Sequence, residues 1–530
     1  MSTHPTPERY DFVVVGAGSA GCAVAARLSE DPETTVLLLE AGGTDQRQEV
    51  QIPAAFSQLF KSDADWNYQT TPQRNLGGRR IYWPRGKVLG GSSSMNAMMW
   101  VVGFAADYDH WAELAGPEWS WEALAPLFAD NGITVSAQRD PRSHTAAFLR
   151  AFEEAGYLVE EANKPEPGGF AQTLVTQSGG ARWNSVRGYL DAAAGRENLS
   201  VLSEAHVDRV LFDGRRATGV RYHTDGHWRE AVADAEIILS AGAVNTPTIL
   251  LRSGIGPADD LHKLGIPVLV DSQDVGRQMR DHLVTFLTRE AFEDTLFDAM
   301  TPEQLEKYGT EQMGMLTSNV AESYGFVKTD PGLEHADIEI LAAPAAYVKE
   351  GLEGIPGHGL SIGSILLLPE SRGSVTLADA DPFSAPLIDP GYLTDPGGAD
   401  RARQLEGVRV CERILATDAM SRHIGAHYIE PENGETLEPE QRAEVAISTL
   451  SHTLYHPTST ARMGSDEGSV VDPELRVRGV HGLRVADASI MPEIIRGHTH
   501  APSVVIGEKA AQFIRRSVVE SAREGASRVS

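Results

Sequence analysis

The sequence predicts an α/β protein, α+β overall, with one domain on a mainly parallel sheet and a second domain on an antiparallel sheet with helices. The first domain is indicated near the N-terminus, where apolar β-branched runs at residues 12–15 and 36–39 flank an alanine-rich helical stretch. The second is indicated by residues 284–455, where alternating patterns such as 336–342 and 359–368 are typical of antiparallel strands. A chain of 530 residues is long enough for several domains.

Between the two N-terminal strands lies a G-x-G-x-x-G pattern formed by Gly16, Gly18 and Gly21. Gly16 permits a tight turn, Gly18 lets the backbone approach a pyrophosphate, and Gly21 lets the helix pack on the strand. Glu40 ends the second strand, where an acid accepts hydrogen bonds from ribose hydroxyls. The alternative is that the glycines form a turn in an ordinary α/β unit that binds no nucleotide, but this does not explain the acid at position 40. The motif therefore predicts a Rossmann-like dinucleotide-binding domain. It does not distinguish FAD from NAD.

Composition excludes several classes of function. Lys and Arg number 46 and Asp and Glu number 74, so the formal charge is −28 and the surface repels nucleic acid and anionic membranes. The only cysteines are Cys22 and Cys411, which excludes a disulfide framework. Residues 1–9 lack the apolar segment of a signal peptide, and no run is apolar enough to cross a bilayer. We therefore expect a cytoplasmic enzyme with no membrane span and no nucleic-acid partner.

Two further segments carry ligand-binding signals. Residues 90–94, two glycines and three serines, form a loop rich in hydrogen-bond donors before a helical stretch, which suits a phosphate or a flat cofactor ring. Residues 236–243 form a buried strand that ends in small residues, and we expect the next helix to start at residues 245–247 with a proline in its first turn. Ligands of α/β sheets bind where strands give way to helices in this manner.

The C-terminal part holds two histidine pairs, His452 with His456 and His498 with His500, and an acid, Asp487, at the end of a predicted strand. The His-x-His spacing of the second pair can bind a metal, but no carboxylate stands at ligand spacing, so we predict no metal site. A histidine is the natural proton acceptor near neutral pH, and the adjacent prolines fix the local backbone. The pairs are therefore candidates for acid–base catalysis.

Together these motifs resemble the glucose–methanol–choline (GMC) family of flavin-dependent alcohol oxidoreductases, nearest its bacterial choline dehydrogenase and oxidase branch. The similarity extends over nearly the whole chain, residues 11–514. The motifs that carry it are the glycine turn with Glu40, Gly90-Gly91-Ser92-Ser93, the segment from Ser240 to Pro247, Tyr455-His456-Pro457, Ala486-Asp487-Ala488-Ser489 and His500-Ala501-Pro502.

The resemblance implies FAD as the cofactor. It implies that the ADP half is bound by Gly16, Gly18, Ser19, Ala20, Gly21, Glu40 and Ala41, and the adenine edge by Val207. It places Gly90, Gly91, Ser92 and Asn96 along the isoalloxazine and ribityl region, and Asp487 and Ala488 near the pyrophosphate or ribityl chain. Ala241, His500 and Ala501 complete the implied set of cofactor-binding residues. Some family members attach FAD through a histidine where Met95 stands in this chain, so we expect non-covalent FAD.

The same resemblance implies the reaction. His456, with His500 as the second catalytic residue, takes the hydroxyl proton of an alcohol, hydride passes to flavin N5, and an aldehyde or ketone results. The electron acceptor is O₂ or a quinone or dye; Leu454, which stands where some oxidases keep a smaller residue, slightly favours a dehydrogenase. Two alternatives remain at this stage: a hydroxynitrile-lyase-like enzyme on the same FAD scaffold, and an NAD-dependent dehydrogenase.

The departures from the family pattern concern the substrate. In choline oxidases a glutamate two residues after an Asp-His pair faces the quaternary ammonium, and Val284 stands at that position here. A buried cation without a carboxylate loses its charge partner, so we expect that choline is not the substrate. Phe56, Met99, Val284, Leu454 and Tyr455 are predicted to form an apolar substrate pocket instead. The family usually carries an arginine where Val102 stands, and the sequence does not explain that change.

The resemblance divides the chain into two domains. The predicted FAD-binding domain is discontinuous and comprises residues 1–140, 190–283 and 456–530. The predicted substrate-binding domain comprises residues 141–189 and 284–455. The expected partners are a small-molecule alcohol and the electron acceptor, and a homodimer is compatible with the sequence.

Overall fold

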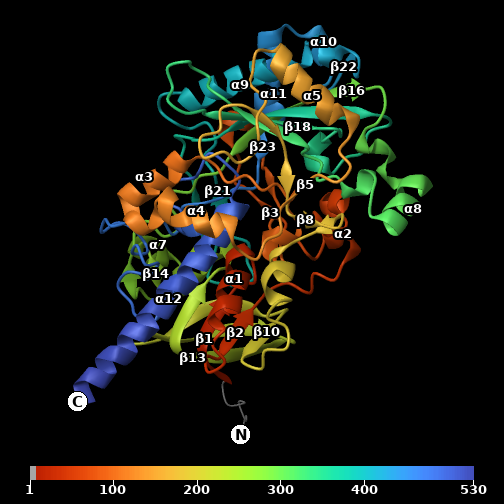
Figure 1. Cartoon of the computed structure of the whole chain (residues 1–530). Helices are drawn as coiled ribbons and strands as arrows, with labels where there is room; N and C mark the ends of the chain where they lie inside the picture. The colour runs from red at the N-terminus through yellow and green to blue at the C-terminus, as the bar shows by residue number, and fades with distance from the viewer. Residues whose placement is uncertain (1–7, 530) are drawn as a thin grey trace.

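Two large sheets organise the molecule and lie at opposite ends of it (Figure 1). The computed structural model describes residues 8–529 and the side chains of residues 8–520, so the predicted domain ends at residues 1–7 and 530 lie outside the described residues. The first sheet has seven strands in the order β10-β2-β1-β13-β12-β11, with β24 beside β13. These strands are β1 (Glu8–Val15), β2 (Val36–Leu39), β10 (Leu199–Leu202), β11 (His206–Asp213), β12 (Arg216–Thr224), β13 (His227–Leu239) and β24 (Leu483–Val485).

The central strands of this sheet form where the apolar runs predict them. β1 pairs in parallel with β2 on one side and with β13 on the other, and the four residues of β2 are all buried. On its other side, β2 pairs in parallel with β10. Asn198 fixes this position, since its Nδ2 donates to the carbonyls of Thr34 (2.7 Å) and Ser29 (3.1 Å).

Three helices pack around the strand ends of this sheet: α1 (Ser19–Leu28), α6 (Gly242–Arg252) and α12 (His500–Val529). Helix α6 begins at Gly242 rather than at the predicted residues 245–247, so Pro247 lies inside the helix. A proline leaves the carbonyl four residues earlier without an N–H partner. Here Thr460 supplies the missing donor, because its Oγ1 donates to the Ala243 carbonyl at 2.7 Å.

The second sheet also has seven strands, in the order β22-β16-β19-β18-β17-β6 with β23 beside β16, and its strands pair antiparallel. It consists of β6 (Phe170–Gln172), β16 (Leu283–Ala291), β17 (Ser323–Val327), β18 (Ile338–Ala343), β19 (Gly359–Leu366), β22 (Ile424–Glu430) and β23 (His452–Thr453). The predicted antiparallel sheet is therefore present. All eight residues of its central strand β19 are buried.

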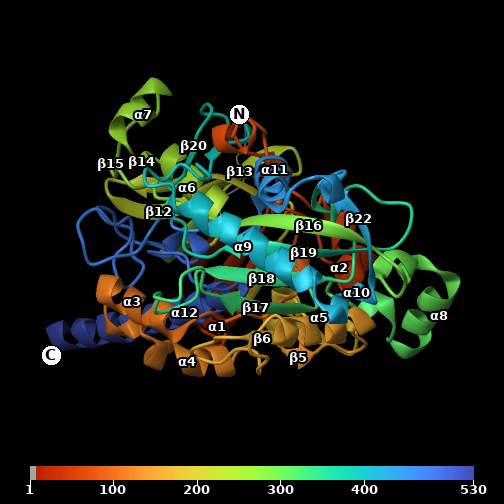
Figure 2. The same cartoon turned by 90° about the horizontal axis from the view of Figure 1, so that it is seen from above.

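Helices cover one face of the second sheet, as Figure 2 shows for α9 lying across the strands. These helices are α5 (Ser143–Glu154), α9 (Ala399–Leu415), α10 (Asp418–Ser421) and α11 (Pro439–Leu450). Helix α9 forms because Val408, Cys411 and Leu415 recur at helical spacing, and all three are buried.

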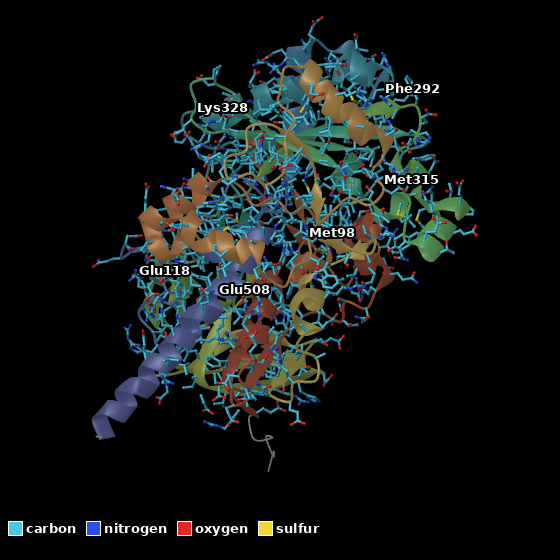
Figure 3. All side chains as sticks on the ribbon, in the orientation of Figure 1. Met98, Glu118, Phe292, Met315, Lys328 and Glu508 are labelled. Carbon is cyan, nitrogen blue, oxygen red and sulfur yellow. The ribbon has the colours of Figure 1, made fainter. Side chains whose placement is uncertain are left out.

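Shorter elements lie outside the two large sheets. They are α2 (Gln48–Gln51), α3 (Ala105–Ala115), α4 (Trp121–Ala129), α7 (Ala258–Lys263), α8 (Pro302–Glu311), the 3₁₀ turns at Pro53–Leu59 and Gly91–Ser94, and the strands β3 (Tyr68–Gln69), β4 (Tyr82–Trp83), β5 (Ser136–Ala137), β7 (Leu174–Val175), β8 (Gln177–Ser178), β9 (Ala181–Arg182), β14 (Ile255–Gly256), β15 (Val270–Asp271), β20 (Ser374–Thr376) and β21 (Leu387–Asp389). The segment after Gly91–Ser94 runs between the sheets, and Met98 lies near the centre of the molecule (Figure 3). Among the described helices, none combines the length and the apolar character needed to cross a membrane. The boundaries of the two predicted domains stay a prediction.

Candidate active site

The glycine turn between β1 and α1 brings three backbone segments into contact. Gly16 has φ +98°, a conformation that favours glycine. A Cβ on Gly21 would lie 1.9 Å from the Gly16 carbonyl oxygen, so only glycine lets α1 pack this closely on β1. A Cβ on Gly91 would lie 2.8 Å from the Gly18 Cα, which shows that the serine-rich loop closes over the same turn. No side chain caps the start of α1, so its first N–H groups are available to an anion.

Two buried carboxylates hold the ends of the parallel strands. Glu40 accepts hydrogen bonds from the N–H groups of Ala17 and Gly42, both at 2.9 Å, and burial raises its pKa to about 7. Asp487, after β24, accepts from the Gly242 N–H at 2.9 Å and the Ser489 N–H at 2.8 Å. Both acids therefore shape the loops around the polar cavity that they line.

Two cavities meet at the junction of the sheets. The polar cavity, of about 340 Å³, extends along the glycine turn and the start of α6. The apolar cavity, of about 160 Å³, extends from the same loops toward the second sheet. They adjoin each other, because five residues line both: Ser19, Arg85, Ser92, Ala488 and Ser503. This elongated shape suits a dinucleotide whose ring end enters the apolar cavity.

Most of the residues predicted to bind the cofactor line these cavities. The polar cavity is lined by Gly16, Gly18, Ser19, Ala20, Glu40, Ala41, Gly91, Ser92, Val207, Ala241, Asp487 and Ala488. Asn96 and His500 line the apolar cavity. Gly21, Gly90 and Ala501 line neither cavity; Gly21 packs against the backbone of Gly16 behind the turn.

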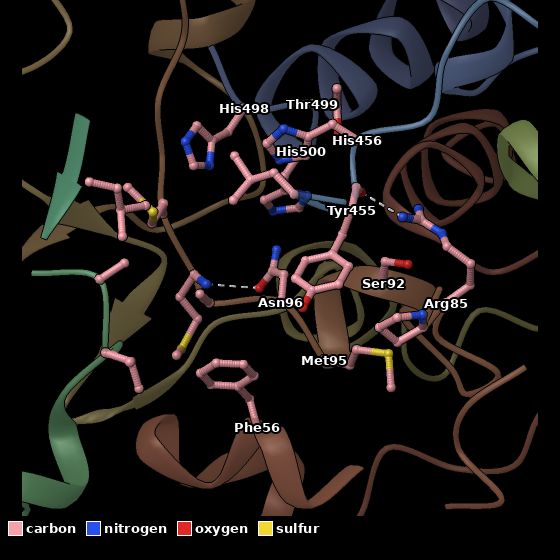
Figure 4. A pocket seen from close by; sticks show the side chains of 18 of the residues that line it. Phe56, Arg85, Ser92, Met95, Asn96, Tyr455, His456, His498, Thr499 and His500 are labelled. Atoms are coloured by element: carbon pink, nitrogen blue, oxygen red, sulfur yellow. Dashed lines mark hydrogen bonds between the residues drawn. The ribbon is translucent and has the colours of Figure 1, made fainter. Parts of the chain in front are cut away.

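Asn96 presents its amide nitrogen to the apolar cavity. Its Oδ1 accepts hydrogen bonds from the Met98 N–H (3.0 Å, drawn in Figure 4) and from Arg182 Nη1 (2.7 Å). Because both partners can only donate, the Asn96 Nδ2 group is the end that remains for a ligand. Arg182 is 1% exposed and burial lowers its pKa to about 9, so a buried cation holds this amide in place. The sequence analysis assigned no role to Arg182.

The hydrogen bonds of His456 fix its tautomer. His282 Nε2 donates to the Leu367 carbonyl at 2.9 Å, so in the neutral ring its Nδ1 is an acceptor. His282 Nδ1 lies 2.9 Å from His456 Nδ1, which must therefore carry the proton. Burial lowers the pKa of His456 well below its usual value and that of His282 to about 3, so both rings are neutral at physiological pH. The unprotonated nitrogen of His456 is thus Nε2.

The backbone around His456 is held in an unusual conformation. Tyr455 has φ +68°, which is uncommon for a residue other than glycine. Arg85 Nη1 donates to the Tyr455 carbonyl at 2.7 Å, as Figure 4 shows, and Asp281 Oδ1 accepts from the His456 N–H at 2.8 Å. Two side chains from distant segments therefore position the imidazole.

His498, not His500, lies beside His456. The rings of His456 and His498 are 4.8 Å apart, and His498 Nε2 lies 3.0 Å from Oε1 of Glu339, a residue of β18 that is 0% exposed. His500 Nδ1 lies 3.0 Å from Ser19 Oγ, at the start of α1. Both line the apolar cavity along the same side, opposite Phe56 and Met95 (Figure 4). The catalytic role predicted for His500 stays a prediction.

The predicted substrate pocket requires one correction. Phe56, Met99, Leu454 and Tyr455 line the apolar cavity, but Val284 does not. Val284 is 0% exposed, because its side chain is buried in one cluster with the lining residues Met99, Phe286 and Leu454. The cavity also has aromatic residues that the sequence analysis did not name: Phe60, Phe286 and Tyr347.

Comparison with known proteins identifies the chain. The sequence model of GMC oxidoreductases matches residues 10–284 with its N-terminal part and residues 369–507 with its C-terminal part. The chain belongs to the GMC oxidoreductase family. This GMC oxidoreductase is 52% identical over 524 residues to a GMC-type oxidoreductase of Mycobacterium tuberculosis, which covers 95% of this chain and 99% of the relative. It is 38% identical over 535 residues to an alcohol dehydrogenase [acceptor] of Pseudomonas putida, covering 96% of each chain.

A solved structure supports the same conclusion for the fold. Formate oxidase of Aspergillus oryzae, described for the modification of its FAD, superimposes on this GMC oxidoreductase with a TM-score of 0.90 and 28% identity, covering 97% of this chain and 99% of that one. The protein is therefore an FAD-dependent oxidoreductase of the class that acts on CH–OH donors. Its glycine turn, uncapped α1 and oriented Asn96 amide fit FAD.

Proposed function

We propose that this GMC oxidoreductase oxidises an apolar alcohol to an aldehyde or ketone. The observation that carries the proposal is the free Nε2 of a neutral, buried His456 in a cavity that adjoins the dinucleotide cavity. FAD, when bound, supplies the acceptor for the hydride that leaves the alcohol carbon. The name of the Pseudomonas putida relative supports an alcohol as substrate.

The protein's own residues handle the hydroxyl proton. His456 Nε2 accepts the proton, and its Nδ1–H remains bonded to His282, so the ring keeps its orientation as it becomes charged. His498 Nε2 donates to Glu339, which orients the His498 ring at the cavity beside His456. The buried Glu339 carboxylate then lies close to the positive charge that the histidine pair acquires. Apolar walls exclude water around these groups.

Choline is not the proposed substrate. No carboxylate is among the described residues that line the apolar cavity, and the valine at 284 lies behind its wall. A quaternary ammonium would be buried there without a counter-charge. The acceptor for the electrons is O₂ or a quinone, and a dehydrogenase is favoured by the relative named alcohol dehydrogenase [acceptor].

The test is an anaerobic visible spectrum of the holoenzyme titrated with primary and secondary alcohols, followed by admission of air. Loss of the oxidised flavin band on adding an alcohol is expected. Rapid return of colour with hydrogen peroxide would identify O₂ as acceptor, whereas slow return that a quinone accelerates would identify a dehydrogenase. A yellow protein that no alcohol bleaches contradicts the proposal.

FAD is proposed to be non-covalently bound, because Met95 offers no nucleophilic nitrogen in the loop that faces the cavity. Precipitation of the purified protein with trichloroacetic acid should release all of the yellow colour into the supernatant. Colour retained in the washed pellet would mean that another side chain forms a covalent bond to the flavin.

We further propose that His498 is the second histidine at the reacting alcohol and that His500 serves FAD binding. His498→Ala is expected to slow anaerobic flavin reduction by about 10²–10³-fold, as for loss of one oriented polar group at a reaction centre. His500→Ala is expected to weaken FAD binding by about five- to tenfold through its lost bond to Ser19. Stopped-flow reduction and FAD titration of both apo-variants separate the roles. The reverse pattern would restore the assignment of His500 as catalytic.

A further inference from the structure

Four rings form one end of the apolar cavity: Phe286, Tyr347, His452 and Tyr455. The ring of His452 stacks on Phe286 at 5.7 Å and lies 6.2 Å from Tyr347 and 6.1 Å from Tyr455. These rings come from β16, β23 and the loops after β18 and β23. The proposed proton transfer to His456 uses none of their polar atoms, so their hydrogen-bonding capacity needs a separate explanation.

His452 offers a hydrogen-bond acceptor to this end of the cavity. Its Nδ1 lies 2.7 Å from the Thr453 carbonyl oxygen, so Nδ1 carries the proton. Burial lowers the pKa of His452 to about 4, which keeps the ring neutral at physiological pH. The Nε2 lone pair therefore points away from the backbone, and no described residue donates a hydrogen bond to it.

Tyr347 and Tyr455 offer a donor beside that acceptor. Their hydroxyl oxygens are 3.0 Å apart, and only one of the two hydrogens can lie between them. The other hydrogen remains free to donate, and no described residue accepts it. One acceptor and one donor, set among apolar rings, match a group that both donates and accepts, which is a hydroxyl group.

An ammonium group fits this end of the cavity less well. No carboxylate is among the described residues that line it, and the carboxylate of Glu339 is bonded to His498. Glu350 lies close enough to act on Tyr347 and Tyr455, but it does not line the cavity, and burial raises its pKa to about 7, which weakens it as a counter-charge. A buried ammonium would therefore lack a paired charge, whereas a neutral hydroxyl would complete both free hydrogen-bonding positions.

We infer that His452, Tyr347 and Tyr455 form a binding site for a second hydroxyl group of the substrate. The substrate class is then a primary alcohol with an apolar body that ends in another hydroxyl, either an aliphatic diol or a hydroxyaryl alcohol. This inference rests on the proposed function, because it places the reacting hydroxyl at His456 and the second hydroxyl at the ring cluster. It names three specificity-determining residues outside the histidine pair.

The test compares alcohols that differ only in the distal group. 1,6-Hexanediol is paired with 1-heptanol, and 4-hydroxybenzyl alcohol with 4-methylbenzyl alcohol. The hydroxyl member of each pair is expected to show kcat/KM about ten- to a hundredfold higher, because a methyl group would leave buried polar atoms unpaired. Dissociation constants from the shift of the flavin spectrum in slowly reacting mixtures provide a second measure that does not depend on turnover.

Variants assign the preference to the three residues. His452→Phe removes the acceptor and keeps a ring, and the double variant Tyr347→Phe/Tyr455→Phe removes both hydroxyl donors; each is expected to reduce the kcat/KM ratio within a pair to about one to three. The kcat/KM ratio of each variant is compared with that of the wild type for the same pair of alcohols. The electronic effect of the aryl hydroxyl on reactivity is the same in both proteins and therefore cancels. Tyr324→Phe is the matched control, since this buried tyrosine of β17 does not line the cavity and should leave the ratio unchanged. Because the two variants are made separately, the test remains possible if one of them does not fold.

The outcomes separate this inference from the proposed function. If both members of a pair reduce the flavin and bind equally well, the proposed function stands and the hydroxyl site is wrong. If 6-amino-1-hexanol is preferred over 1,6-hexanediol, the site binds a cation and the inference is also wrong. If no alcohol reduces the flavin but the diol still binds more tightly than 1-heptanol, the proposed function fails and the hydroxyl site stands.

Discussion

Replacing His456 with alanine is expected to slow anaerobic flavin reduction by about 10²–10⁴-fold, the usual contribution of a general base, while FAD stays bound. The reason lies in the two bonds that fix the imidazole: the His282 acceptor at 2.9 Å on Nδ1, and the Asp281 acceptor at 2.8 Å on the backbone N–H. They leave Nε2 as the basic atom at the cavity. Stopped-flow reduction at saturating alcohol measures the effect directly.

The control for this substitution is His423→Ala. His423 is a histidine near the end of α10, outside both cavities, so its removal should leave the reduction rate unchanged. The visible spectrum of His456→Ala should still show stoichiometric flavin, because the cofactor-binding loops do not depend on this ring. Unchanged reduction of FAD by a good substrate in His456→Ala would show that another group takes the proton.

Turn motifs and hydrophobic patterns in the sequence correctly predicted individual strands and helices. The glycine turn, the buried runs around it and the alternation in residues 336–342 and 359–368 correspond to β1, α1, β2, β18 and β19. Side-chain periodicity and turn chemistry act over a few residues, so such elements can be predicted from one sequence. The family motifs then indicated the cofactor and His456.

Long-range pairing determined what the sequence did not reveal. His498 and His500 are close in sequence, and contacts with distant residues distinguish them: Glu339 on β18, 159 residues away, for His498, and Ser19 for His500. Val284 fits an apolar pocket by composition, but packing with Met99 and Leu454, which are distant in sequence, buries it completely. The contact of His282 with His456 joins segments 174 residues apart. The periodic patterns of a single sequence do not predict contacts between such distant segments.

Replacing Gly21 with alanine is expected to abolish stable FAD binding. The new Cβ would lie 1.9 Å from the Gly16 carbonyl oxygen and 3.1 Å from the Ser240 Cβ, and the first of these is a backbone atom that no rotamer change can move. Helix α1 must therefore shift away from β1. That shift displaces the uncapped N–H groups at the start of α1 from the position where they can meet a phosphate.

The expected result for Gly21→Ala is less than about one tenth of the wild-type flavin content after dialysis, with a loss of about 1–3 kcal/mol in the free energy of unfolding of the apo-protein from overpacking. Gly43→Ala is the matched control, because a Cβ there meets no atom within 4 Å and the residue lies in the same part of the chain. FAD content comes from the ratio of visible to ultraviolet absorbance, and denaturant unfolding compares the apo-proteins. If Gly21→Ala unfolds like the control yet cannot be reconstituted, the close approach of α1 to β1 serves the cofactor rather than the fold. If it retains FAD with unchanged affinity, the dinucleotide does not bind at this turn.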